Sequence, residues 1–141
     1  MEQKDYLLRE IEKIGTVLRA ILNRLRGSKD NSAIQLEKQF EEVKEMLSSQ
    51  LDFNLNDYLS LNEIDSIDYI SQFKGINLKN LEVLANILTV FGMNVTLADR
   101  KVYLEKALLL FEHCNHTDKT FSFERQSNIE AIKIALESLS G

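Results

Sequence analysis

The stretch FEHCNHTDKTFSF carries the residues of this sequence that are best suited to chemistry. Both histidines, the only cysteine, a glutamate and an aspartate fall between positions 112 and 118. Side chains of these types could bind a zinc ion, which takes nitrogen, sulfur and oxygen ligands. They could also form a cysteine nucleophile that is activated by a histidine base. Either kind of site requires several of these side chains to converge on one point.

Helical spacing argues against a metal site in this stretch. On a helix, His113 and His116 would share a face, and so would Glu112 and His116. Cys114, in contrast, lies about 100° around the helix from His113, so the ligands point in different directions. The stretch also lacks the paired CxxC or HExxH spacings of common zinc sites. We therefore predict no metal site and no cofactor, and the candidate ligands are Glu112, His113 and His116.

The simplest interpretation of this stretch is structural. Cys114 is predicted to face inward as a small packing residue, where a thiol is usually inert. The two histidines would meet the negative end of a helix dipole, and NHTDK would form the solvated turn that follows. We expect Phe121 and Phe123 to pin the next helix to the core. No catalytic residue is predicted, and the chain is not expected to be an enzyme.

Charged residues suggest two possible partner surfaces. Residues 1–29 carry seven Lys or Arg and four acidic residues, whereas residues 50–73 carry five acidic residues and no Lys or Arg. The acidic group lacks the glycine and the terminal glutamate of a calcium loop. Charged faces are often merely solvated, but a partner would be sought here. The candidate partner-binding residues are Arg9, Lys13, Arg24, Asp57, Glu63, Asp65 and Asp68.

Composition narrows the class of protein. The chain has 141 residues, a net charge of −5 and a hydrophobic content of 44%, which is ordinary for a folded globular domain. The acidic balance argues against nucleic acid or an anionic membrane as the main partner. A single cysteine cannot form an intrachain disulfide, and the charged N-terminal sequence MEQKDYLLREIEK does not resemble a signal peptide. We expect a cytoplasmic protein.

The elements that must position these residues are all predicted to be helices. The chain has no proline, and its apolar residues recur at spacings of three and four. In the first helix they cover an arc of roughly 140°, which is typical of packing against several helices. Gly15 falls inside this arc, where it either lets a second backbone come close or is simply tolerated at a cost of roughly 1 kcal/mol. The stripe consists of Leu7, Ile11, Ile14, Leu18, Ile21 and Leu25.

We predict a single all-α domain, residues 1–141, with about six helices. Residues 1–51 are expected to form an antiparallel hairpin, with its second helix capped by Asn31 or Ser32. Residues 52–75 are expected to hold short irregular helices, including one that runs from Asn62 to Gly75. Residues 76–141 are expected to form a three-helix unit. Its helices begin at Asn77, at Thr96 and near residue 122; Gly92 ends the first, and the last runs to about residue 139.

The last three helices resemble a tetratricopeptide-type unit. Leu81, Leu84-Ala85 and Leu88 have the spacing of its first helix, and Ala107, Phe111 and Cys114 have that of its second. The two blocks lie about ten residues further apart than in a standard repeat, and the usual proline is absent. The resemblance covers residues 78–115, with 122–139 as a closing helix. It implies a repeat-like helical bundle in which small residues admit bulky neighbours.

The whole chain is also similar to a family of small uncharacterised bacterial helical proteins. The similar stretches are DYLLREIEKIGTVL, NLEVLANIL, YLEKALLLFE and TFSFER. This resemblance implies a helical fold and no established activity, and it supplies no site residues.

Three hypotheses for the function follow. The leading one is a non-enzymatic protein–protein interaction module that binds a protein or peptide of unknown identity. The alternative is a structural homo-oligomer, such as a homodimer sealed by the apolar stripe of the first helix. The third is a small metal-binding protein that uses His113 and His116.

Overall fold

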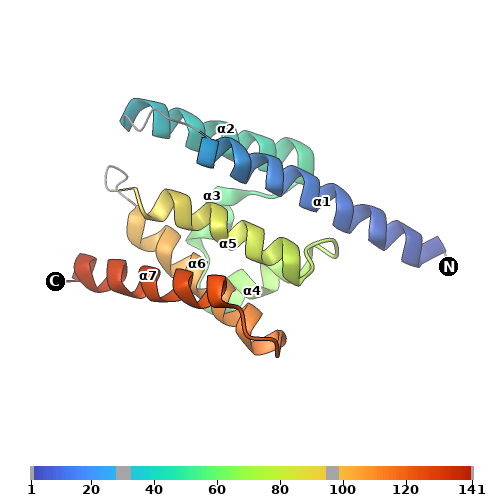
Figure 1. Cartoon of the computed structure of the whole chain (residues 1–141). Coiled ribbons are helices and arrows are strands. Elements are labelled where there is room, and N and C mark those ends of the chain that lie inside the picture. The colour runs from blue at the N-terminus through green and yellow to red at the C-terminus, as the bar shows by residue number, and fades with distance from the viewer. Residues whose placement is uncertain (1, 28–32, 95–98, 141) are drawn as a thin grey trace.

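The computed structural model describes residues 2–27, 33–94 and 99–140, and within these ranges it consists of helices and their connections, with no strand (Figure 1). This confirms the predicted all-α class. The described ranges hold seven helices, and two of them are short helices within residues 52–75. Their bounds are α1 Glu2–Gly27, α2 Ala33–Leu51, α3 Leu55–Ser60, α4 Glu63–Ser71, α5 Leu78–Gly92, α6 Arg100–Thr117 and α7 Phe123–Ser140.

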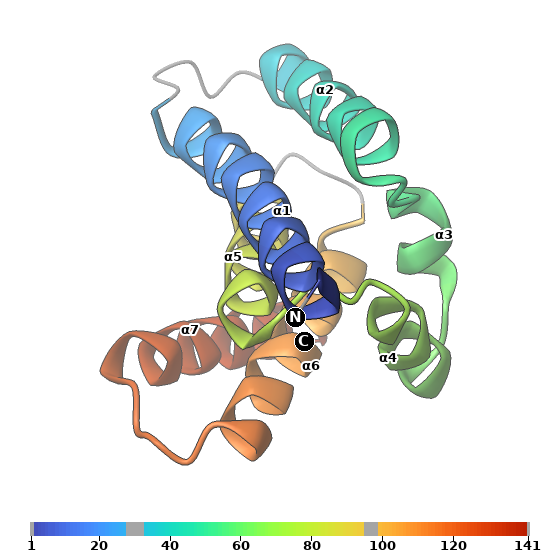
Figure 2. The ribbon, with the colours of Figure 1, turned by 90° about the vertical axis from the view of Figure 1, so that its right-hand side faces the viewer.

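Helix α5 lies at the centre of the molecule. Helix α1 packs against one side of it and α6 against another, and α7 packs in turn on α6 (Figures 1 and 2). Helix α2 returns antiparallel to α1, as predicted for a hairpin, and the short helices α3 and α4 follow it down one flank (Figure 2). Helix α3 contacts both α2 and α6. Helices α1 to α4 therefore precede the central helix α5 in the chain, and α6 and α7 complete the bundle after it.

The sequence of α5 suits this central position. Its buried apolar residues form one broad face, which is wide enough for both α1 and α6 to pack on it. Leu84, Ile87, Leu88 and Phe91 are almost completely buried, and Ala85 leaves room for a neighbour between them. Truncation of such a leucine to alanine typically costs about 2–5 kcal/mol. Helix α5 therefore contributes a large part of the buried core.

Asparagine side chains set the starts of three helices. The Oδ1 atoms of Asn54, Asn62 and Asn77 accept hydrogen bonds from backbone N–H groups in the first turns of α3, α4 and α5. These bonds satisfy N–H groups that have no partner within the helix. The predicted starts at Asn62 and Asn77 are confirmed, as is the end of α5 at Gly92.

The other predicted helix ends have different outcomes. Helix α4 ends at Ser71, so the predicted end at Gly75 is wrong. Gly75 instead allows a close approach to α1, because a Cβ there would lie 2.8 Å from the backbone oxygen of Glu10. The caps predicted at Asn31 or Ser32 and at Thr96 lie outside the described residues.

Gly15 admits a neighbouring side chain at the contact between α1 and α5. The Asn80 amide nitrogen donates to the backbone oxygens of Ile11 and Gly75, over 2.9 and 2.8 Å. A Cβ on Gly15 would lie 2.8 Å from Oδ1 of Asn80. The atoms nearest to this position belong to the Asn80 and Arg19 side chains, and not to a second backbone as the first alternative for Gly15 expected.

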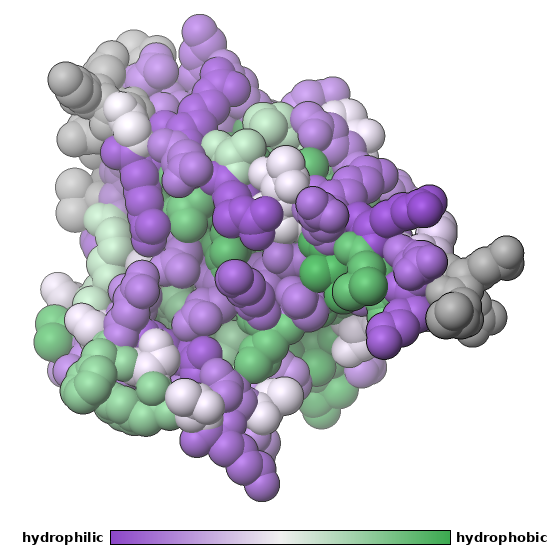
Figure 3. Space-filling view, turned by 45° about the vertical axis from the view of Figure 1, so that its right-hand side comes forward, coloured by the Kyte–Doolittle hydropathy of each residue, from purple (hydrophilic) through white to green (hydrophobic). Residues whose placement is uncertain are grey.

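The apolar stripe of α1 is used mainly inside the chain. Ile14, Leu18 and Ile21 are at most 5% exposed. Towards its N-terminus the helix projects beyond the other elements (Figures 1 and 3), and there Leu7 is 38% exposed. The space-filling view shows hydrophobic side chains in separate patches between hydrophilic ones (Figure 3). A homodimer sealed by the central part of the stripe would require α1 to leave its place on α5.

The two phenylalanines before α7 do not pin that helix to the core. Phe121 is 65% exposed and Phe123 is 84% exposed, and their rings contact each other edge to face at 4.8 Å between centroids. That prediction is wrong because both residues lie in or beside the connection from α6, ahead of the buried face of α7. Ile129 and Ile132, further along α7, reach the core instead.

In the described part of the chain, no helix is both long enough and apolar enough to cross a lipid bilayer.

Candidate functional site

The structure separates the residues of the FEHCNHTDKTFSF stretch. Cys114 lies inside the bundle and is completely buried, with its Sγ 3.9 Å from the backbone oxygen of Leu78. Glu112, His113 and His116 are exposed on the outside of α6. Burial raises the pKa of the Cys114 thiol to about 11, so the thiol is protonated at neutral pH. A protonated, buried thiol is a poor nucleophile.

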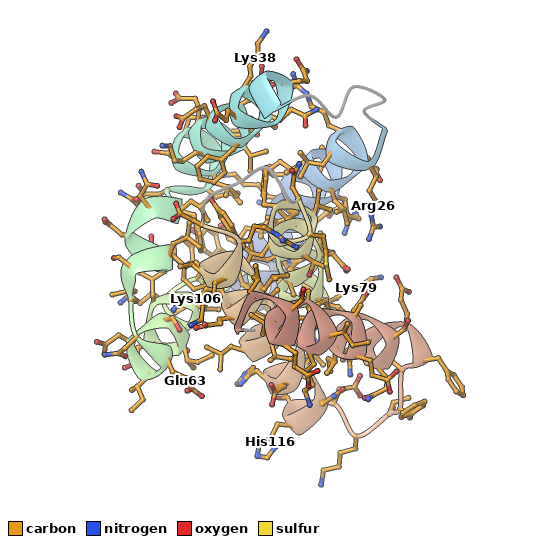
Figure 4. The ribbon with its side chains drawn as sticks, turned by 90° about the vertical axis from the view of Figure 1, so that its left-hand side faces the viewer. Arg26, Lys38, Glu63, Lys79, Lys106 and His116 are labelled. Carbon is orange, nitrogen blue, oxygen red and sulfur yellow. The ribbon has the colours of Figure 1, made fainter. Side chains whose placement is uncertain are left out.

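The candidate metal ligands do not converge. Among the described residues, no group of three or more histidine, cysteine and acidic side chains is arranged to hold a metal ion. In Figure 4, His116 lies at the far end of α6, away from Glu63 and Lys106. The geometry therefore gives no support to the hypothesis of a metal-binding protein that uses His113 and His116.

The basic candidates on α1 do not form one surface. Arg24 is paired with Glu42 of α2, at 2.7 Å between Nη2 and Oε2, where the ion pair joins the two helices of the hairpin. Arg9 and Lys13 are exposed further toward the N-terminus. Lys13 lines a shallow depression of about 390 Å³ together with Tyr6, and Arg9 lies outside it.

The acidic candidates are all exposed, and one of them, Glu63, lines a groove. Asp57 and Asp65 lie in the first turns of α3 and α4, where their backbone N–H groups are bound by the capping asparagines. Asp68 is exposed further along α4. Glu63, at the start of α4, faces a groove that is shared with α6. Of the seven predicted partner-binding residues, Glu63 thus lines this groove and Lys13 lines the depression beside α1.

This α6 groove lies between α6 and the segment that joins α3 to α4. It has a volume of about 400 Å³ and is open to solvent. Apolar side chains on both walls are only partly covered, and on α6 Val102 is 37% exposed. Its walls are formed by Leu59, Leu61, Asn62 and Glu63 on one side and by Val102, Glu105, Lys106, Leu108, Leu109 and Glu112 on the other.

Lys106 crosses from α6 to the opposite wall of the groove. Figure 4 shows its side chain directed from α6 toward the α3–α4 segment, on the same side of the molecule as Glu63. Its Nζ donates to the backbone oxygen of Leu61 and lies 5.7 Å from the centroid of the Tyr58 ring. Burial lowers the pKa of Lys106, while the negative charges of Glu105 and Glu63 act in the opposite direction. The ammonium group therefore fastens α3 to α6.

Tyr58 is the aromatic platform behind Lys106. Its ring is completely buried and contacts Phe53 and Tyr69, but its hydroxyl has no hydrogen-bond partner among the described residues. Burial raises the pKa of this hydroxyl well above its ordinary value, so it stays neutral. By contrast, the hydroxyl of Tyr69 accepts a hydrogen bond from the backbone N–H of Asn54, over 2.8 Å.

A second polar cluster, centred on Arg125, is structural. The Arg125 side chain is 4% exposed and reaches two other helices and a connection. It donates to both carboxylate oxygens of Glu82 on α5, to Asn115 on α6 and to Asp118 in the following connection. Bonds from Thr120 and Arg125 also hold the pKa of Asp118 below its ordinary value. Because these bonds tie Arg125 to its own chain, we assign the cluster to joining α5, α6 and α7.

No family model, curated protein or solved structure matches this chain.

The α6 groove is thus the part of the described surface best suited to binding. Covering the apolar side chains on its walls would be favourable, and its carboxylates give it a charge preference. The groove could not be predicted from the sequence, because Leu61, Lys106 and Leu109 become neighbours only through the packing of α3 on α6. The signal that the sequence does contain is the row of Val102, Glu105, Leu109 and Glu112, which share one face of a helix.

Proposed function

We propose that this chain is a non-enzymatic protein-interaction module whose α6 groove receives a segment of a partner protein. The observation that carries the proposal is the exposure of apolar side chains on both walls of one groove, with charged groups around them. A groove between helices that recognises a peptide usually combines such apolar side chains with polar groups at its rim.

Three polar or reactive side chains make contacts within the chain. Cys114 packs in the core, Lys106 links α6 to α3, and Arg125 links α7 to α5. The groove, in contrast, keeps Val102 and Leu109 accessible on α6 although both are apolar. Exposed apolar side chains that gather in a depression are a common mark of an interaction site.

The proposal can be tested by peptide selection, which does not require the partner to be identified first. A displayed library of random peptides would be selected on the wild-type protein and then tested against two variants. Leu109→Asp places a charge in the groove. Ile134→Asp is the matched control, because Ile134 is an apolar residue on α7 that is 68% exposed.

We expect the selected peptides to bind the wild-type protein and the Ile134→Asp variant, and to lose binding to Leu109→Asp. Circular dichroism would verify that both variants remain helical, and Val102→Asp would replace Leu109→Asp if the latter failed to fold. A selection that yields no peptide sensitive to a groove substitution would contradict the proposal.

A further inference from the structure

Helix α6 presents a regular row of apolar and acidic side chains along the groove. Val102, Glu105, Leu109 and Glu112 follow one another at spacings of three, four and three residues, so they lie on the same face of the helix. The row extends over about 15 Å, roughly three turns. A second helix that lay along the groove would meet an apolar residue and a carboxylate in alternation.

The opposite wall adds negative charge. It belongs to the segment 50–73, which contains five acidic residues and no Lys or Arg. Within that segment, Glu63 lines the groove and its charge acts on Lys106, as does the charge of Glu105 on the α6 side. Both walls therefore contribute negative charge to the groove.

Among the residues that line the groove, carboxylates outnumber cations, because Glu63, Glu105 and Glu112 stand against Lys106. The Lys106 ammonium group is engaged by the Leu61 backbone oxygen and the Tyr58 ring at the inner end of the groove. Lys101 lies 3.8 Å from Glu105, but both side chains are more than half exposed, so water and salt screen this pair. The groove thus combines apolar side chains on both walls with an excess of negative charge.

We propose that the α6 groove binds a basic amphipathic helix, a refinement that rests on the interaction function proposed above. Apolar side chains of that helix would cover Leu61, Val102 and Leu109. Its Lys or Arg residues would lie opposite Glu63, Glu105 and Glu112. Such a helix would match the apolar side chains of the groove with apolar residues and its carboxylates with positive charges. These residues would recur at the spacing of three and four that α6 itself presents.

The probe is a synthetic helical peptide of about fifteen residues, in which leucine and arginine alternate along one face at spacings of three and four residues. A matched isomer carries glutamate in place of every arginine. Binding of both peptides to the full chain would be measured by fluorescence anisotropy at low and at physiological salt. Chemical-shift changes of the backbone amides would locate the binding site.

Two charge-reversed proteins provide the control. In one, Glu105→Lys and Glu112→Lys are combined in the groove. In the other, Glu130→Lys and Glu137→Lys are combined on α7, outside the groove, so the net charge changes equally. We expect the wild-type protein to bind the arginine peptide roughly tenfold more tightly than its isomer. This preference should be lost or reversed in the groove variant and retained in the α7 variant.

Several outcomes would overturn the inference. These are equal binding of the two isomers, equal effects of the two charge-reversed proteins, and chemical-shift changes that avoid residues 59–63 and 102–112. If peptides selected from the random library depend on the groove but are neutral or acidic, the inference fails while the proposed interaction function stands. A dimer in sedimentation experiments that dissociates on Leu109→Asp substitution would instead assign the groove to a second copy of the chain.

Discussion

At the scale of single residues, two tyrosines in one aromatic cluster differ in what their hydroxyls reach. The Tyr69 hydroxyl accepts a hydrogen bond from the backbone of Asn54, whereas the Tyr58 hydroxyl has no partner among the described residues. A buried polar group without a partner costs about 1–3 kcal/mol, while a typical hydrogen bond contributes about 1 kcal/mol. The same chemical change should therefore have opposite effects at the two positions.

We predict that Tyr58→Phe raises the free energy of unfolding by about 1 kcal/mol and that Tyr69→Phe lowers it by about the same amount. Urea denaturation would check this as shifts of the midpoint in opposite directions at an unchanged slope. A loss of stability in Tyr58→Phe as large as that in Tyr69→Phe would mean that the Tyr58 hydroxyl is satisfied, for instance by a buried water molecule.

The Cys114 thiol gives a prediction about pH. Burial raises its pKa from an ordinary value of 9.0 to about 11, so the folded protein keeps a proton that the unfolded chain releases between these values. The thiol's contribution to stability is therefore complete below about pH 9 and is lost as the pH rises toward 11.

We expect native Cys114 to resist alkylation at a mildly alkaline pH and to react once urea unfolds the protein. Over the same alkaline range, Cys114→Ala should lose less stability than the wild-type protein. Rapid alkylation of the native protein would contradict the buried placement.

At the scale of the helices, Gly15 and Gly27 of α1 test how α1 and α5 fit together. A Cβ at Gly15 would lie 2.8 Å from Asn80 Oδ1 and from the Arg19 side chain, whereas a Cβ at Gly27 would meet nothing within 4 Å. Asn80 cannot move away easily, because its amide nitrogen is held by two backbone oxygens. Alanine is otherwise favoured over glycine in a helix by roughly 1 kcal/mol.

We therefore predict that Gly15→Ala lowers the stability by about 1–2 kcal/mol, because the steric cost exceeds the gain in helix propensity. Gly27→Ala should leave the stability unchanged or raise it slightly. Thermal denaturation of both variants would check the difference. A Gly15→Ala variant as stable as Gly27→Ala would show that Asn80 can shift without cost.

The helices also show how far the sequence could predict this fold. The spacing of apolar residues located the main helices, and Asn62 and Asn77 located two helix starts, because both signals are local. What the sequence did not predict depends on tertiary neighbours. The partnership of Arg125 with Glu82 joins residues 43 positions apart, and Lys106 meets Leu61 across 45 positions. The α6 groove depends on such contacts. The sequence therefore indicated only two of its features, which are the spacing of the residues on its α6 wall and the acidic character of the segment that forms its other wall.

At the scale of the whole molecule, the position of α1 separates two assemblies. Leu18 is 1% exposed where α1 packs within its own chain, whereas Leu8, nearer the N-terminus of the helix, is 55% exposed. If α1 belongs to the core of each chain, a charge at position 18 must be buried or the helix must detach. If α1 sealed a dimer instead, the same charge would separate two chains that stay folded.

We predict that Leu18→Glu destabilises the chain by at least about 3 kcal/mol and removes its cooperative unfolding transition, whereas Leu8→Glu changes the stability by less than about 0.5 kcal/mol. Circular dichroism during denaturation and sedimentation equilibrium would be measured on the same samples. A Leu18→Glu protein that halves its mass but keeps a cooperative transition would place the α1 stripe between two chains. Loss of the transition, with the mass of Leu8→Glu unchanged from wild type, would keep α1 on α5 of its own chain and leave the α6 groove as the surface on which to seek a partner.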